Sequence, residues 1–275
     1  MTPTRALRSA GPGRGVLSSS EPDGTLEGYR VLPSAELAPY VHHFWSVRWA
    51  LDTPFLGAAL PHPAASVVIE GVGATCRAGV RGVHTDRFTR RLCGEGSTFG
   101  IAFRPAMFQP LVGAPMTTLT DRVVAVDAVL GPAFEAAARA IVDVPDLEGK
   151  IARAERLLTA TLLPAPPEVV RWRDLVERVA VDRSLLRVED VSAVVDLDER
   201  TLQRSFRKYV GVSPKWVLRR YRLHEAAEQL KARRAPALAD LAASLGYADQ
   251  AHFTRDFTRV VGQTPRAFAL AGRRG

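Results

Sequence analysis

The sequence predicts an α+β N-terminal domain, with a small antiparallel sheet plus helices, followed by an all-α C-terminal domain built from two helix-turn-helix motifs. Three observations support this prediction: short β-branched and aromatic segments separated by glycines, helical spacing of apolar residues further on, and an internal repeat near the end. A chain of 275 residues is long enough for two domains. We predict a flexible tail (1–26), an α+β regulatory, sensor or dimerisation domain (27–163), a Pro-rich linker (164–168) and a double helix-turn-helix domain (169–275).

The elements of the N-terminal domain follow from changes in hydrophobic period. The tail is rich in Gly, Ser, Pro and Arg and offers little apolar surface to bury. Short aromatic or β-branched runs bounded by Gly or Pro predict strands at 44–51, 66–70 and 100–104. Spacing typical of helices predicts two helices at 132–142 and 147–163, the second with an apolar stripe of Leu147, Ile151, Ala154, Leu158 and Leu162.

The boundary between the domains is marked by proline. The run Pro164-Ala165-Pro166-Pro167 cannot be helical throughout and favours an extended, semi-rigid connection. Beyond it the pattern is helical to the end of the chain, so we place the linker at 164–168.

Composition excludes several classes of protein. The chain is 47% hydrophobic and 24% charged, which is typical of a globular protein. No apolar run approaches the roughly 18 residues of a spanning helix, and no signal-peptide pattern is present, so we expect a cytoplasmic protein with no membrane partner. Two cysteines, Cys76 and Cys93, are too few for a disulfide framework and are interpreted as small core residues.

Positive charge is concentrated in the C-terminal part. Residues 168–275 carry 21 Lys and Arg against 14 Asp and Glu, whereas residues 1–167 carry 16 against 15. Cations clustered on one face gain affinity for a polyanion by releasing counterions from phosphates. Solubility alone is the other interpretation of this charge.

The last hundred residues contain a repeat at an offset of 51 residues. Leu202-Gln-Arg-Ser-Phe206 and Gly211-Val-Ser-Pro214 recur as Phe253-Thr-Arg-Asp-Phe257 and Gly262-Gln-Thr-Pro265. Each copy predicts a short helix, a tight turn and a second helix, which is the plan of a helix-turn-helix motif.

In the first copy we predict a helix at 188–195 in which Ala193 permits close approach of two helices. Asp196 is expected in the turn, in a left-handed conformation that Asp tolerates less well than Gly. Asp198 is expected to cap the second helix, which continues to about Tyr209.

In the second copy the helix is predicted at 238–245. The Gly246 turn and the Asp249 cap repeat the plan.

The outward faces of the two second helices predict DNA recognition. Leu202 and Phe206 in one copy, and Phe253 and Phe257 in the other, belong in the core by their spacing. Arginine pairs with guanine and glutamine with adenine in the major groove. The predicted base contacts are Arg200, Gln203, Arg204, Gln250, Ala251, Thr254 and Arg255, and a solvated helix face is the alternative for any single one of them.

Phosphate contacts are expected nearby. Gly211 and Gly262 can end their helices, and Ser213-Pro214 and Thr264-Pro265 can each start a new one, whose free N–H groups suit phosphate oxygens. We predict phosphate contacts by Arg207, Lys208, Lys215 and Arg266. A helix from Pro214 to about Lys231 would span roughly 26 Å and connect the two motifs, with Arg219, Arg220 and Arg222 beside the DNA backbone.

These residues resemble the AraC/XylS family of bacterial transcription regulators over about residues 168–275. The segments Gly246-Tyr-Ala-Asp-Gln-Ala-His-Phe253-Thr-Arg-Asp-Phe257 and Gly262-Gln-Thr-Pro265-Arg-Ala-Phe268 are similar to the family signature. The resemblance implies seven helices and two motifs that bind consecutive major-groove segments of double-stranded DNA. It also implies contact with RNA polymerase if the protein is an activator. Asp196 replaces the usual turn glycine, and Ser205 stands where an apolar residue is common, so we expect a less stable first motif.

Residues 28–163 resemble an uncharacterised N-terminal domain that is fused to such DNA-binding units. The resemblance lies in Pro39-Tyr-Val, Phe44-Trp45 and Phe99-Gly-Ile-Ala-Phe-Arg104-Pro105. By analogy this part would bind a small-molecule effector or form a homodimer. Trp45, Trp49 and Phe103 are candidates to line an effector pocket, although core packing explains them equally well.

Other classes of site find little support in the sequence. His42, His43, His62 and His84 lack metal-ligand spacing, so no metal is predicted, and no motif requires a cofactor. We therefore predict that the protein is not an enzyme. The alternatives are a DNA-tethered repair or methyl-transfer enzyme with Cys76 or Cys93 as nucleophile, and a module whose basic face meets an acidic protein.

Overall fold

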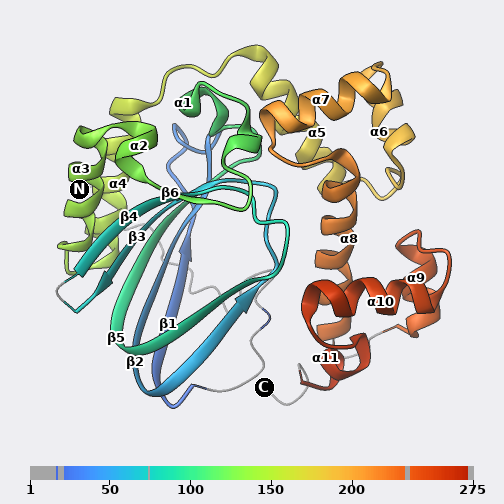
Figure 1. Cartoon of the computed structure of the whole chain (residues 1–275), viewed down its shortest axis with the longest axis horizontal. Coiled ribbons are helices and arrows are strands. Elements are labelled where there is room, and N and C mark those ends of the chain that lie inside the picture. The colour runs from blue at the N-terminus through green and yellow to red at the C-terminus, as the bar shows by residue number, and fades with distance from the viewer. Residues whose placement is uncertain (1–16, 18–21, 74, 233–235, 272–275) are drawn as a thin grey trace.

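The chain forms an N-terminal α+β part and a C-terminal helical part that pack against each other (Figure 1). The structure is a computed structural model, and it describes residue 17 and residues 22–73, 75–232 and 236–271. In Figure 1 the sheet and its helices lie on the left, and helix α8 stands upright on the right between two groups of helices.

The N-terminal part is built on a six-stranded sheet in which every pair of neighbours is antiparallel. The strand order is β1-β2-β5-β3-β4-β6. The strands are β1 (Gly24–Val31), β2 (Val41–Ala59), β3 (Ser66–Val72), β4 (Thr75–Arg81), β5 (Phe88–Phe103) and β6 (Val123–Ala125). Two of the strands expected from the sequence lie within β2 and β3, and the third overlaps the end of β5; this antiparallel α+β architecture confirms the predicted fold class.

The predicted tail (1–26) is too long at its C-terminal end. Residues 24–26 already belong to β1, where Leu26 lies opposite Trp49 and packs against it. Leu17 is also buried, and its amide donates to the carbonyl oxygen of Ala58 (2.9 Å). A few apolar residues that find cross-strand partners are enough to order a stretch of otherwise polar composition. Residues 1–16 and 18–21 of the predicted tail lie outside the described residues.

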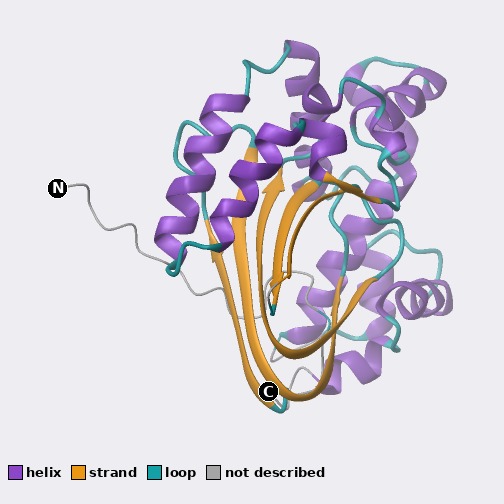
Figure 2. Ribbon diagram, turned by 60° about the vertical axis from the view of Figure 1, so that its left-hand side comes forward, coloured by secondary structure: helices purple, strands orange, loops and turns teal. Residues whose placement is uncertain are grey.

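The two longest strands, β2 and β5, bend at the end of the sheet that lies away from the helices (Figure 2). Their register shifts between Leu51 and Phe55, and Gly94 has φ +56°. An irregular register of this kind bends a strand pair and increases its twist. The sheet therefore has a concave face, and its opposite face packs against the helices.

Helices cover the face opposite the concave one. After β5 come α1 (Gln109–Val112), a 3₁₀ turn η1 (Met116–Thr118), α2 (Val126–Leu130), α3 (Pro132–Val142) and α4 (Leu147–Thr161). Helix α3 packs on β3, β4 and α4. The bounds of α3 agree with the predicted helix, and Asp146 caps α4 by accepting from the amide of Gly149 (2.7 Å). Of the predicted stripe, Ile151, Ala154 and Leu158 are buried.

The linker is shorter than predicted. Helix α5 (Pro167–Val181) begins inside the expected linker, because proline suits the first turn of a helix. The remaining helices are α6 (Val188–Val195), α7 (Glu199–Tyr209), α8 (Pro214–Lys231), α9 (Leu238–Ser244), α10 (Gln250–Val261) and α11 (Pro265–Ala271).

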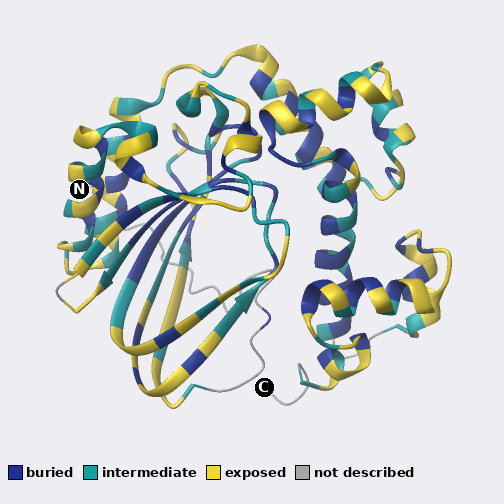
Figure 3. Cartoon of the chain, viewed as in Figure 1, coloured by how far each residue is buried: buried dark blue, intermediate teal, exposed yellow. Residues whose placement is uncertain are grey.

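Two hydrophobic cores contain residues of both parts. Helix α8, which is coloured largely as buried in Figure 3, contributes to each of them. The main N-terminal core lies between the sheet and its helices. A second core joins Val83, Ala106 and Met107 of the N-terminal part to residues of α5, α7 and α8. A third core places Leu17 and Leu60 against α8, α9 and α10. Among the described helices none combines the length and the apolar character needed to cross a bilayer.

Candidate nucleic-acid interface

The first helix-turn-helix motif is formed by α6 and α7. Asp196 adopts a left-handed conformation between them (φ 50°, ψ 53°), as the sequence predicts. Arg171 of α5 donates to the carbonyl oxygen of Val195 (2.7 Å), and Ser192 donates to the carbonyl oxygen of Leu197. These two hydrogen bonds stabilise the turn. Asp196 adopts there a backbone conformation that costs glycine less free energy than it costs any residue with a side chain.

Helix α7 is strongly amphipathic. Leu202, Phe206 and Tyr209 are buried, and Trp172 of α5 packs on both rings, with centroids 5.8 Å from Phe206 and 5.9 Å from Tyr209. Asp198 caps the helix by accepting from the amide of Thr201 (2.9 Å), and this hydrogen bond lowers the pKa of the Asp198 carboxyl. The buried stripe leaves the opposite face of α7 for solvent.

The second motif repeats the first with α9 and α10. Gly246 forms the turn with φ +72°, and Asp249 caps α10 by accepting from the amide of His252 (2.6 Å). Phe253 and Phe257 are fully buried, with ring centroids 5.6 Å apart. The prediction that Ala193 permits close helix contact is wrong, because Ala193 and its counterpart Ala243 are both exposed.

The structure places the predicted base contacts on the free faces of α7 and α10. All are exposed except Thr254, which is half-buried; the exposed ones are Arg200, Gln203, Arg204, Gln250, Ala251 and Arg255. These side chains are exposed in the whole chain, with the N-terminal and C-terminal parts packed together. The N-terminal part therefore leaves the outward faces of both helices accessible.

The predicted phosphate contacts are exposed as well: Arg207, Lys208, Lys215 and Arg266. The Nζ of Lys208 donates to the Tyr209 hydroxyl (2.7 Å), and this hydrogen bond raises the pKa of Lys208, so the lysine stays charged. Ser213 and Thr264 cap α8 and α11 as predicted, by accepting from the amides of Trp216 (3.2 Å) and Ala267 (3.2 Å).

The arginines of α8 do not lie free beside a DNA backbone, contrary to the prediction. Arg220 is 3% exposed and donates to the carbonyl oxygen of Thr85 (2.6 Å). Arg222 donates to the carbonyl oxygen of Leu186, and Arg219 pairs with Asp256 of α10. Other elements surround α8 along its length. Its three arginines therefore bind groups of the protein itself and connect α8 to those elements.

Asp256 is a structural residue that is not among those predicted from the sequence. Its side chain is 3% exposed and also accepts from the Tyr247 hydroxyl (2.9 Å). Residues 253, 256, 257 and 260 form one helical stripe, so the spacing places this carboxylate in the core beside Phe253 and Phe257. The periodicity that located the phenylalanines could have identified Asp256.

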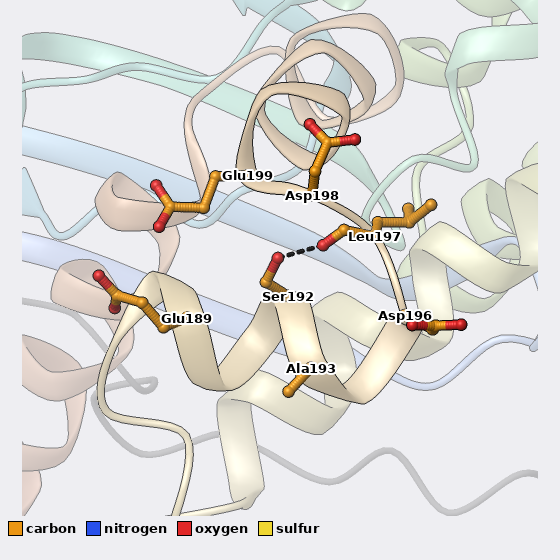
Figure 4. A pocket seen from close by; sticks show the side chains of 7 residues that line it. All are labelled: Glu189, Ser192, Ala193, Asp196, Leu197, Asp198 and Glu199. Atoms are coloured by element: carbon orange, nitrogen blue, oxygen red, sulfur yellow. Dashed lines mark hydrogen bonds between the residues drawn. The ribbon is translucent and has the colours of Figure 1, made fainter.

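A shallow notch between α6 and the start of α7 is lined by carboxylates (Figure 4). Glu189, Asp196, Asp198 and Glu199 contribute its acidic side chains. Asp198 and Glu199 stand at the positive end of the α7 dipole, where negative charge is stabilising. The notch thus belongs to the turn, and the predicted base contacts begin one residue further on, at Arg200.

A loop of the N-terminal part, residues 82–87, contacts the helix that joins the two motifs. The carbonyl oxygen of Thr85 accepts from Trp216 Nε1 (3.2 Å) and from Arg220 Nη2 (2.6 Å) of α8. Asp121 holds Thr85 in place by accepting from its amide (2.7 Å) and its hydroxyl (2.8 Å). We call residues 82–87 the bridging loop.

The N-terminal part also contacts the C-terminal end of each second helix. The Thr120 hydroxyl donates to the carbonyl oxygen of Gly211, two residues after the end of α7 (2.7 Å). Arg87 of the bridging loop donates to the carbonyl oxygen of Val261, at the end of α10 (2.8 Å). Both motifs are therefore attached to one small region of the N-terminal part.

The three candidate effector residues do not lie together. Phe103 belongs to the main core under the helices, whereas Trp49 belongs to a separate cluster with Leu51, Phe55 and Leu92. Alternation along β2 puts Trp45 and Trp49 on the concave face. The cysteines also differ from expectation, since Cys76 is half-buried against the main core but Cys93 is exposed.

A pair of histidines, His62 and His224, lies at the junction of the two parts. His62 stacks on His224 of α8 (centroids 4.3 Å apart), and His224 donates through Nε2 to the carbonyl oxygen of Pro61 (3.1 Å). Burial lowers the pKa of His43 to about 3 and that of His62 well below its usual value. Within the described ranges no three His, Cys, Asp or Glu side chains are grouped so that they could hold a metal ion.

Two families match separate parts of the chain. One, described as a helix-turn-helix domain, matches residues 191–271, and the other, described as a domain of unknown function, matches residues 29–125. No curated protein matches the sequence.

Among solved structures, the chain is similar to a transcriptional regulator with an AraC-type DNA-binding domain from Chromobacterium violaceum, at 21% identity over 36% of this chain and 88% of that one (TM-score 0.33). It is similar to the C-terminal domain of AraT, a response regulator from Geobacillus stearothermophilus, at 23% identity over 38% of this chain and 85% of that one (TM-score 0.34). It is also similar to ToxT from Vibrio cholerae, at 9% identity over 90% of this chain and 98% of that one (TM-score 0.43).

Proposed function

We propose that this chain, a transcription regulator with an AraC-type helix-turn-helix domain, inserts α7 and α10 into successive major-groove segments of double-stranded DNA. The observation that carries the proposal is the pair of matched exposed faces, each backed by buried aromatic residues, on one scaffold. Helix α8 spans roughly 26 Å, which suits two recognition helices that enter the groove about one 34 Å turn apart.

In this proposal the side chains divide into two roles. Arg200, Gln203 and Arg204 of α7 read base edges in one segment, and Gln250, Thr254 and Arg255 of α10 read the next, with Ala251 limited to apolar contact such as a thymine methyl. Phosphates are contacted by Arg207, Lys208, Lys215 and Arg266, which set the position on the duplex without reading sequence.

We infer that the N-terminal part regulates DNA binding through the relative position of the two motifs. It leaves the exposed faces of α7 and α10 open but is hydrogen-bonded to the end of each helix and to α8. A ligand-driven shift of the region around the bridging loop would change the distance or angle between the recognition helices. A small-molecule effector acting on this region is part of the proposal; contact with RNA polymerase and homodimer formation stay predictions from the sequence.

We assign no catalytic step to the N-terminal part. Burial raises the pKa of the Cys76 thiol and so disfavours the thiolate that a methyl-transfer nucleophile needs. Methyl-transfer activity that disappears in a Cys76→Ala, Cys93→Ala double variant would instead support the enzyme alternative.

The experiment that tests the proposal is footprinting of the intact protein on operator DNA selected from a random library. We expect two protected major-groove segments about 10 base pairs apart on one side of the duplex. Protection of a single segment, or affinity that does not depend on sequence, would contradict the proposal.

A further inference from the structure

The concave face of the N-terminal sheet carries aromatic and cationic side chains. Trp45 and Trp49 of β2 point to this face, and Arg30 of β1, directly opposite Trp45, points the same way. The ring of Trp45 lies over Gly100 of β5, where any Cβ would come within 2.0 Å of the indole. Gly100 therefore makes room for a large flat side chain on this face.

The far end of β5 folds back over the same face. Glu70 of β3 lies opposite Thr98, so Arg90 is eight positions further along β5, or roughly 26 Å away on a straight strand. Arg90 nevertheless forms an ion pair with Glu70, and its guanidinium lies 5.8 Å from the Trp49 ring. The bend therefore brings the returning hairpin against this face, where Phe55 and Leu92 pack with Trp49 and Leu51.

Positive charge exceeds negative charge around Glu70 on this face. The Glu70 carboxylate pairs with both Arg90 and Arg81, and its Oε1 lies 4.0 Å from Nη2 of Arg81. Arg81 also lies over the Phe88 ring (4.1 Å), and its Nε is buried with no hydrogen-bond partner in the described part of the chain. Burial lowers the pKa of Arg81 to about 10 and lowers the pKa of Arg30 and Arg90 as well. Desolvated guanidiniums that share one carboxylate are suited to a further anion.

We propose that the concave face binds a small organic anion with a flat apolar body, whose charged group pairs with Arg81 and Arg90 while its body packs on the half-buried Trp45. This inference rests on the proposed function of the N-terminal part and names the chemical class of its effector. A planar guanidinium fork matches a carboxylate or phosphate edge, and the indole ring of Trp45 supplies a flat apolar surface.

The bridging loop leads directly from this site to the DNA-binding motifs. It begins after Arg81 and ends before Phe88, whose side chains pack on each other at the site. Its Thr85 and Arg87 make the contacts to α8 and α10. An anion that draws Arg81 away from Phe88 therefore moves both ends of the loop that holds the two motifs.

The test is calorimetric titration of the intact chain with nicotinate, its neutral isostere nicotinamide and inorganic phosphate. We expect saturable binding of nicotinate, with nicotinamide weaker by roughly tenfold or more because it lacks the charge, and phosphate weaker because it lacks the flat body. Equal binding of nicotinate and nicotinamide, tighter binding of phosphate, or no saturable binding of nicotinate would overturn the proposal.

Variants localise the binding. Arg81→Gln is expected to weaken nicotinate by roughly tenfold or more, while Glu70→Gln, which frees both guanidiniums, is expected to tighten it. Arg91→Gln is the matched control, since Arg91 is exposed and adjacent to Arg90 on the other side of β5. A loss in Arg91→Gln as large as that in Arg81→Gln, or no tightening in Glu70→Gln, would overturn the assignment. Operator footprinting on the same preparations tests the proposed function separately, because it needs no anion.

Discussion

Arg219 of α8 forms an ion pair with the buried carboxylate of Asp256 on α10. The pair joins the second recognition helix to the helix that connects the two motifs. Tyr247, just after the second turn, donates to the same carboxylate, so the turn, the recognition helix and the connecting helix meet at one residue. The orientation of α10 therefore depends on a polar group in an otherwise aromatic core.

Asp256→Ala is expected to lower the free energy of unfolding by about 2–3 kcal/mol, because it leaves the Tyr247 hydroxyl and the Arg219 guanidinium without their buried acceptor. Urea denaturation followed by circular dichroism measures this. Asp240→Ala, at an exposed position of α9, is the control, with an expected change below about 0.5 kcal/mol. Equal stability of the two variants would refute the role given to Asp256.

Asp196→Gly is expected to raise the free energy of unfolding by about 0.5–1 kcal/mol. The left-handed conformation costs a non-glycine residue about 1–2 kcal/mol, and the greater freedom of glycine in the unfolded chain offsets part of that gain. Asp196→Ala, which keeps the strain, serves as the comparison in the same denaturation experiment. A glycine variant no more stable than the alanine variant would contradict this account of the turn.

Asp121→Ala is expected to loosen the bridging loop, because Asp121 accepts two hydrogen bonds from Thr85. If the loop sets the distance between the motifs, the variant should tolerate a base pair inserted between the two halves of the operator better than the wild type does. Such an insertion rotates one half by about 35° relative to the other. Gel shifts on the two operators measure the ratio of affinities, and an unchanged ratio would show that the loop does not control spacing.

Stability is expected to fall as the pH is lowered from 7 to 5. Burial holds the pKa of His43 near 3, whereas in the unfolded chain it is about 6.5, so between these values the unfolded state binds a proton that the folded state does not. The stability conferred by neutral His43 is fully present above pH 6.5 and decreases by about 2 kcal/mol by pH 5. His43→Gln should reduce the slope of unfolding free energy against pH; an unchanged slope would show that His43 titrates normally.

The helices of the DNA-binding part could be predicted from the sequence nearly to the residue, because their signals are local. Asp198, Asp249 and Ser213 cap helices where expected, and α6 and α8 have the predicted bounds. The roles of the α8 arginines could not be predicted, since Arg220 reaches Thr85 across 135 positions of sequence. Local periodicity gives the face of a helix but does not say which distant loop covers it.

The same limit applies to the N-terminal part. Glycine and β-branched residues indicated strands, yet the bend in β5 that brings Arg90 to Glu70 depends on a register shift and on pairing with β2. Their aromatic character makes Trp45 and Phe103 candidates for one effector pocket. Their positions in the pleat nevertheless put them on opposite faces of the sheet. Strand register, which is set by distant partners, decides which side chains meet.

We propose above all that α7 and α10 read two separate segments of one duplex. The most direct measurement is the affinity of wild type, Arg204→Ala and Arg255→Ala for a set of operators, each with one base pair changed. We predict that Arg204→Ala removes discrimination, about 1–3 kcal/mol, within one segment, and that Arg255→Ala does so in a segment about one helical turn away. Loss of discrimination at the same base pairs in both variants, or at none in either, would contradict the account.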